Sequence, residues 1–222
     1  MKYVIANSNS IIIQSLKNHF IPNDFHFIEN KQELTVDLLK EINPKYIFFP
    51  HWSYLISEEI FHTFECIVFH MTDLPFGRGG SPLQNLISRG ITHTKISAIK
   101  VVKELDAGPV YLKKELCLNG NAEEIFLRAS VIISGMIDEI IGNDPIPMEQ
   151  TGEPVFFKRR KPEMSNIERL KQLDQLYDQI RMLDADGYPN AFLENENFRF
   201  EFSRASYKSD NSIIANVRIF KK

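Results

Sequence analysis

Several features that define other protein classes are missing from this sequence. No apolar run approaches the length of a membrane span, and the first residues contain no long apolar stretch of the kind found in signal peptides. Only two cysteines occur in the 222 residues. We therefore expect a cytoplasmic protein in which Cys66 and Cys117 are reduced.

An excess of positive charge is also missing. The chain carries 26 Lys and Arg against 29 Asp and Glu, a formal net charge of −3. Nucleic-acid binding would therefore have to rest on a local patch, and this weighs against an RNA or DNA partner. The basic cluster at residues 158–161 is more often solvated or salt-bridged than an anion contact, with a phosphate contact as the alternative.

Nucleotide-binding glycine motifs of the GxGxxG and GxxxxGK[ST] types are absent. What is present in the first half is an alternation of short apolar runs with helical patterns, which is typical of βαβ units and predicts an α/β, Rossmann-like fold with a mostly parallel sheet. The expected strands are residues 3–6, 25–28, 46–50 and 66–70, and the expected helices are residues 10–20 and 31–42.

The second half predicts a different arrangement toward its end. Strands are expected at 95–102 and 109–118, then an amphipathic helix over 121–141 with Asn121 as N-cap and Glu124 as its capping-box partner. Residues 143–165 are interpreted as a returning strand and a boundary. We expect a domain at 1–160 and, at 161–222, a small unit of one helix (165–184) and antiparallel strands.

The stretch FHMTDLPFGRGGSPLQNLI (69–87) places a histidine at the end of a strand. Cys66, Val68 and His70 share one strand face, and Ser81 with Pro82 predicts a helix start after the turn. Ligands bind at the carboxyl ends of such strands, although a single histidine there is more often structural. Asp106, in the small-residue turn LDAGP, can orient an imidazole.

These two segments together resemble the folate-dependent formyltransferases. That family has NxHxSLLPxxRGxxPxxxAI followed by a DxG turn, and here Asp106 follows His70 by 36 positions, the family's interval. Residues 45–145 carry most of the resemblance, and 180–206 look like the family's C-terminal unit. The matching residues are His70, Thr72, Leu74, Pro75, Arg78, Gly79, Pro82, Asp106 and Gly108.

The resemblance implies transfer of a formyl group from N10-formyltetrahydrofolate to an amine, in a Rossmann-like formyltransferase domain. It implies that His70 stabilises the charge that develops on the formyl oxygen, and that Asp106 holds the imidazole and accepts the proton lost by the amine. The main chain around the 105–108 turn is implied to recognise the pterin. The implied folate-binding residues are Leu105, Ala107, Gly108, Arg78 and Gly79, and no metal site is expected.

One position departs from the family pattern: Val68 stands where the family has asparagine. Valine cannot donate a hydrogen bond to an oxyanion, and loss of such a donor costs about 10²–10³ in rate. Either another donor replaces it, or the protein binds folate without catalysis. The replacement candidates are Thr72, Asn85, His51 and His93. An unrelated small α/β binding domain is the third alternative.

Elimination selects the acceptor amine. Length and charge argue against initiator methionyl-tRNA, and the missing glycine-rich phosphate loop argues against glycinamide ribonucleotide. An amino sugar is left, expected to be nucleotide-linked and to belong to surface-glycan or nonulosonic-acid biosynthesis. A homodimer through the C-terminal β unit is a further expectation. The expected substrate-binding residues are His51, Trp52, Tyr54, Thr72 and Asn85.

Overall fold

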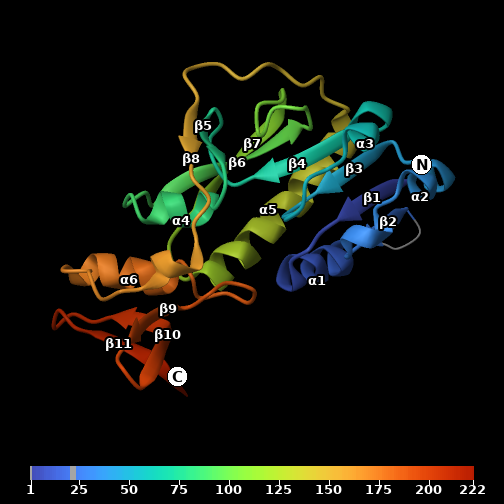
Figure 1. Cartoon of the computed structure of the whole chain (residues 1–222). Coiled ribbons are helices and arrows are strands. Elements are labelled where there is room, and N and C mark those ends of the chain that lie inside the picture. The colour runs from blue at the N-terminus through green and yellow to red at the C-terminus, as the bar shows by residue number, and fades with distance from the viewer. Residues whose placement is uncertain (1, 21–23) are drawn as a thin grey trace.

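A six-stranded sheet forms the centre of the molecule (Figure 1). The computed structural model describes residues 2–20 and 24–222. The strand order is β2-β1-β3-β4-β6-β7; the pairs among the first four are parallel, whereas β6 and β7 run antiparallel to their neighbours. The strands are β1 (Tyr3–Ala6), β2 (Phe25–Ile28), β3 (Tyr46–Phe49), β4 (Cys66–His70), β6 (His93–Lys100) and β7 (Val110–Cys117). The predicted mostly parallel α/β sheet is confirmed.

Helices cover both faces of this sheet. Alternate residues of β1 enter two separate apolar clusters, because successive side chains of a strand point to opposite faces. One cluster includes residues of α1 and α5, and the other includes residues of α2 and α3. The helices are α1 (Ser10–His19), α2 (Val36–Ile42), α3 (Glu58–Thr63), α4 (Pro82–Ile87) and α5 (Ala122–Asn143), with a short 3-10 turn η1 (Lys31–Glu33). This layering explains why the strands are apolar on both faces.

None of the helices in the described ranges is long and apolar enough to cross a membrane. The longest, α5, has 22 residues and buries one stripe against the sheet. Its start is the predicted one. Asn121 Oδ1 accepts the N–H of Glu124 at 2.9 Å, and Glu124 Oε2 accepts the N–H of Asn121 at 2.9 Å.

The chain after α5 returns across the main body before it forms a second sheet. Strand β8 (Val155–Phe157) pairs in parallel with β5 (Phe76–Gly79), far from it in sequence. A 3-10 turn η2 (Pro162–Ser165) and helix α6 (Leu173–Arg181) follow. The three-stranded antiparallel sheet lies beside α6 at one end of the molecule (Figure 1). Its strands are β9 (Ala191–Glu194), β10 (Phe198–Tyr207) and β11 (Ile213–Lys221).

The predicted helix over 165–184 is wrong at its start. The chain near Asn166 pairs with β9 instead of coiling: the N–H of Ile167 donates to the carbonyl of Phe192 at 2.9 Å. The apolar spacing of this segment is helical, but a tertiary partner occupies its backbone. The helix α6 therefore begins only at Leu173.

Replacing Asn121 by alanine is expected to destabilise the fold by about 1–2 kcal/mol, because the cap of α5 is lost. The same side chain also donates to Asp184 Oδ2 at 3.1 Å, so a tertiary contact disappears with it. Urea unfolding followed by circular dichroism measures the effect. Asn119→Ala, at an exposed position two residues earlier, is the matched control. Equal midpoints for the two variants would contradict the assignment.

Candidate functional site

His70 and Asp106 are 36 residues apart in sequence and face each other in the structure. His70 ends β4, and Asp106 lies in the loop between β6 and β7. His70 Nδ1 is 3.6 Å from Asp106 Oδ1, and the two side chains are 10% and 12% exposed. His70 Nε2 lies 2.8 Å from the carbonyl oxygen of Gly77, so this nitrogen carries a proton and donates. Nδ1 is thus the ring nitrogen that faces the carboxylate.

The position of Asp106 is fixed by the backbone of β5 and by the backbone conformation of its own turn. Its Oδ2 accepts the N–H of Gly79 at 2.8 Å, and its own backbone has a φ of 54°, in the left-handed region. Two residues on, the loop passes very close to β6, where a Cβ at Gly108 would lie 1.8 Å from the carbonyl oxygen of Lys100. The resulting geometry leaves no room for a side chain at Gly108 and fixes where the Asp106 carboxylate points.

A cleft of about 580 Å³ opens over this pair. A second cavity of about 320 Å³ adjoins it, and His51, Ser53, Arg159 and Tyr188 line both. Volumes in this range suit organic ligands of the size of a cofactor. Of the residues expected to bind ligand, Leu105, Asp106, Gly108, Gly79, His51, Trp52 and Tyr54 line the larger cleft, together with His70 and Val68.

His51 is held in a strained and buried position. Its φ is 69°, a value that non-glycine residues rarely adopt. Its Nε2 lies 3.2 Å from the Tyr188 hydroxyl, and its ring packs edge-on against Phe126. Its Nδ1 has no hydrogen-bond partner in the described part of the chain, and neither does Nε1 of Trp52. Burial of the ring lowers the pKa of His51 below its usual value.

Four of the predicted site residues are not among those that line the cleft. Thr72 is 0% exposed and its hydroxyl lies 3.5 Å from the Gly77 carbonyl. The Asn85 amide donates inward to the carbonyls of Gly80, Ser81 and Lys158 at 3.0–3.1 Å. The polar groups of Thr72 and Asn85 therefore already form hydrogen bonds within the protein. The other two residues are Arg78 and Ala107.

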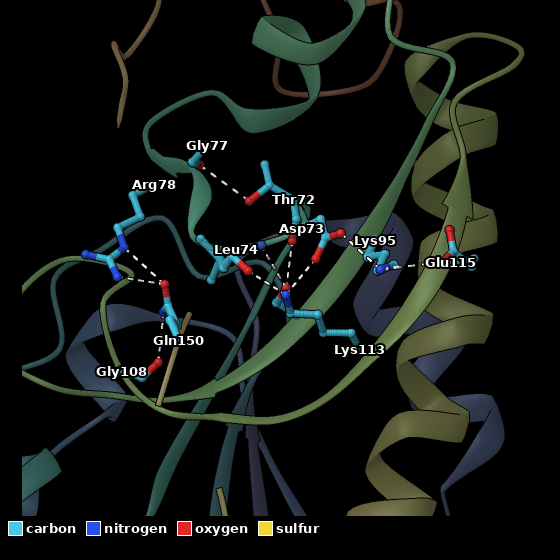
Figure 2. Close-up of polar contacts among 11 residues, drawn as sticks. Thr72, Asp73, Leu74, Gly77, Arg78, Lys95, Gly108, Lys113, Glu115 and Gln150 are labelled. Carbon is cyan, nitrogen blue, oxygen red and sulfur yellow. Dashed lines mark hydrogen bonds and ion pairs between the residues drawn. The ribbon is translucent and has the colours of Figure 1, made fainter. Parts of the chain in front are cut away.

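The Arg78 side chain points to Gln150 (Figure 2). Arg78 does not line the larger cleft. Its Nε and one terminal nitrogen donate to Gln150 Oε1 at 3.1 and 2.7 Å. Gln150 was not among the residues expected from sequence, because it lies in the proline-containing segment after α5, where no periodic pattern marks a contact.

Figure 2 also shows what anchors the loop after β4. Lys113 Nζ lies 2.6 Å from Asp73 Oδ1 and also donates to the carbonyl of Leu74, and Lys95 lies 3.0 Å from the second oxygen of Asp73. Lys95 of β6 and Lys113 of β7 thus hold the loop at residues 73–74, which follows His70 in the sequence motif.

The basic cluster 158–161 is divided in its roles. Arg159 lines both cavities, and its guanidinium has no ion pair among the described residues. Arg160 instead donates to the carbonyl of Met164 at 2.7 Å, and burial lowers its pKa. Of the two interpretations weighed from sequence, an anion contact is therefore open only to part of the cluster.

Neither of the two cysteines lines the cleft. Cys66 and Cys117 are free, and burial raises the pKa of the Cys66 thiol to about 12. Within residues 2–20 and 24–222, no three His, Cys, Asp or Glu side chains are grouped so that they could hold a metal ion.

Comparison with known proteins finds consistent similarities. A family model described as "Methionyl-tRNA formyltransferase, C-terminal domain" matches residues 162–220. The methionyl-tRNA formyltransferase of Thermotoga maritima is 26% identical over 175 residues, which is 75% of this chain and 56% of that protein. The chain therefore spans little more than half the length of this relative. A solved structure titled "Methionyl-tRNA formyltransferase from Clostridium thermocellum" is 52% identical, with a TM-score of 0.97 and full coverage of both chains.

More distant structures share the fold alone. HypX from Aquifex aeolicus in complex with tetrahydrofolic acid is 16% identical, with a TM-score of 0.78 over 94% of this chain and 38% of that one. A 4-N formyltransferase from Francisella tularensis is 15% identical, with a TM-score of 0.66 over 97% and 96%.

The expectations of an amino-sugar acceptor, of glycan biosynthesis and of no nucleic-acid partner are wrong. The sugar N-formyltransferase neighbours match at only 13–15% identity, whereas the Clostridium thermocellum chain matches at 52%. Length was not a valid reason to exclude a tRNA acceptor, since that similar chain is covered in full. Net charge was not valid either, because local charge decides how a polyanion is bound.

The close approach of Gly108 to the Lys100 carbonyl predicts a large loss of stability when the glycine is replaced. Gly108→Ala forces a Cβ into the carbonyl of Lys100, and we expect the free energy of unfolding to fall by about 1–3 kcal/mol, as for an overpacked core. Gly135→Ala is the control: its Cβ meets nothing within 4 Å in helix α5, so it should stabilise by about 0.5–1 kcal/mol. Urea unfolding of both variants measures this, and a neutral Gly108→Ala would contradict the close contact.

The buried His51 predicts a pH-dependent stability. Because its pKa is lowered in the folded state, the unfolded chain binds the proton first as pH falls through about 6.5. Stability should be unaffected above about pH 7 and should fall below it by up to about 1.4 kcal/mol per pH unit. Urea unfolding at pH 7.5 and 5.5 measures the loss. His51→Gln should lose less than wild type between these values, and equal losses would refute the account.

Proposed function

The chain belongs to the formyltransferase family, and on this premise we propose that it transfers the formyl group of N10-formyltetrahydrofolate to the amine of methionyl-tRNA. The observation that carries the proposed chemistry is the His70–Asp106 pair, 3.6 Å apart at the cleft. The proposed acceptor follows the names of the Thermotoga maritima and Clostridium thermocellum proteins. Because translation takes place in the cytoplasm, the proposal keeps the expected location.

The cleft suits the folate donor. Its volume of about 580 Å³ lies within the range of cofactor sites, and its lining includes apolar residues such as Val68 and Ile99 together with residues 101–106. Folate supplies the activated formyl carbon. The backbone groups of the 105–108 turn would recognise the pterin edge, and Leu105, which is 62% exposed at the rim, offers an apolar contact to the bound molecule.

His70 supplies the charge stabilisation. With Nε2 donating to Gly77, a proton on Nδ1 makes that nitrogen a donor toward the cleft and toward Asp106. Negative charge grows on the formyl oxygen when the amine attacks, and a preorganised donor in a poorly hydrated site stabilises it. Val68 adds no donor at the neighbouring position, so the proposal assigns this task to His70. Of the replacement donors considered, only His51 lines the cleft.

Asp106 supplies the base. Its carboxylate is 12% exposed and is oriented by the N–H of Gly79 at 2.8 Å. In this position it can hold the imidazole and receive, directly or through water, the proton that the attacking amine must lose. Both functional groups are therefore fixed before any ligand binds.

The second cavity supports a polyanionic acceptor. Arg159 lines it without an ion-pair partner in the described residues, beside the hydroxyl-bearing Ser8, Ser10 and Ser53 and the carboxylate of Asp186, to which the Ser10 hydroxyl donates at 3.3 Å. An unpaired guanidinium and several donors suit the phosphodiester end of a tRNA better than a neutral sugar ring.

A mass-spectrometric assay tests the proposal. Purified protein, N10-formyltetrahydrofolate and methionyl-tRNA should give formylmethionyl-tRNA, and His70→Ala should lower the rate by about 10²–10⁴ while folate binding is kept. His93→Ala is the control, because His93 is exposed and does not line the cleft. Folate binding without any formylation would show a binding protein and not an enzyme. Full activity of His70→Ala would remove the assigned catalyst.

A further inference from the structure

Gln150 connects two segments, the 105–108 turn and β5, which also meet directly through the Asp106 carboxylate and the N–H of Gly79. Its Nε2 donates to the carbonyl oxygens of Asp106 and Gly108 at 2.8 and 2.9 Å. Its Oε1 accepts both donations from Arg78. One amide therefore satisfies two carbonyls of the 105–108 turn on one side and a guanidinium of β5 on the other (Figure 2).

The Gln150 amide is fixed in place by the backbone on either side of it. Met148 exchanges two hydrogen bonds with Val110 at 2.7 and 2.9 Å, just after the Asp106 turn. Val155 donates to the carbonyl of Pro75 at 3.1 Å, just before β5. The segment carrying Gln150 is thus tied to both neighbours, and its side chain loses little freedom when it makes four bonds.

The charge on Arg78 strengthens the bridge. The guanidinium is half-buried, and Gln150 Oε1 is its hydrogen-bond acceptor in the described part of the chain. A cation at the amide oxygen polarises the amide, which makes its N–H groups better donors to the two carbonyls.

We propose that Gln150 is a positioning residue of the formyl-transfer site: it holds the Asp106 turn against β5, so that the carboxylate meets the N–H of Gly79 and the imidazole of His70. The proposal rests on the proposed function. Gln150 and Arg78 do not line the cleft, so they act through Asp106 and not on substrate. A displacement of about 1 Å in such a group can cost about a hundredfold in rate.

Amide exchange at Gly79 tests the placement without any assay of activity. Gln150→Ala releases the turn, so the N–H of Gly79 should lose its acceptor and exchange at least about tenfold faster by NMR. Gln150→Glu keeps a partner for Arg78 but cannot donate to the carbonyls, so it should behave like the alanine variant. Gln175→Glu, the same change at an exposed position, should leave Gly79 unchanged. Wild-type protection in Gln150→Ala would overturn the proposal.

A double-mutant cycle tests the consequence for catalysis. Gln150→Ala should lower kcat by about 10–100-fold at saturating substrates, with one folate still bound per chain. In an Asp106→Ala background the same change should alter kcat by less than about twofold, because the carboxylate through which Gln150 acts is absent. Equal effects in both backgrounds, or full activity of Gln150→Glu, would overturn it. If wild type forms no formylmethionyl-tRNA, the proposed function fails while the Gly79 measurement still decides the placement.

Discussion

The hydrogen bond from the Gly79 N–H to the Asp106 carboxylate joins the two segments that make the site, and much of the local backbone exists to allow it. Asp106 adopts a left-handed conformation, Gly108 presses against β6, and Gly79 has a φ of 109° with its Cα facing the Phe157 carbonyl. Side chains larger than hydrogen are excluded at both glycines by backbone oxygens. The length of 2.8 Å is normal for an N–H group that donates to a carboxylate.

The sequence predicts the central fold well because the signals there are local and periodic. Buried strands such as β1 and β3 are apolar throughout, and the start of α5 is marked by Asn121 and Glu124. Prediction failed where a distant partner decides the structure. The stretch before α6 has helical spacing, but its backbone pairs with β9, and nothing in the segment itself indicates that partner.

The candidate site was predictable only as far as its motifs reach. The resemblance to the formyltransferases implied that His70 and Asp106 act as a pair, and the structure brings the two side chains together. The amide of Asn85 donates to three carbonyl oxygens of the protein. Its position in the sequence could not distinguish it from residues that face the cleft. The acceptor proposed above was not the one expected from sequence, because the net charge of the whole chain says nothing about where a single cation lies, such as Arg159 at the second cavity.

The pairing of β5 with β8 has a consequence for how the protein is made. Residues 3–117 contain every strand of the central sheet, so that sheet can form while the chain is still leaving the ribosome. Strand β5 has to wait for Phe157, and the Asp106 turn has to wait for Gln150. At about 5–20 residues per second this delay is some seconds, during which the nascent chain has the strands of its central sheet but no assembled site. Folate capture therefore belongs to the finished chain.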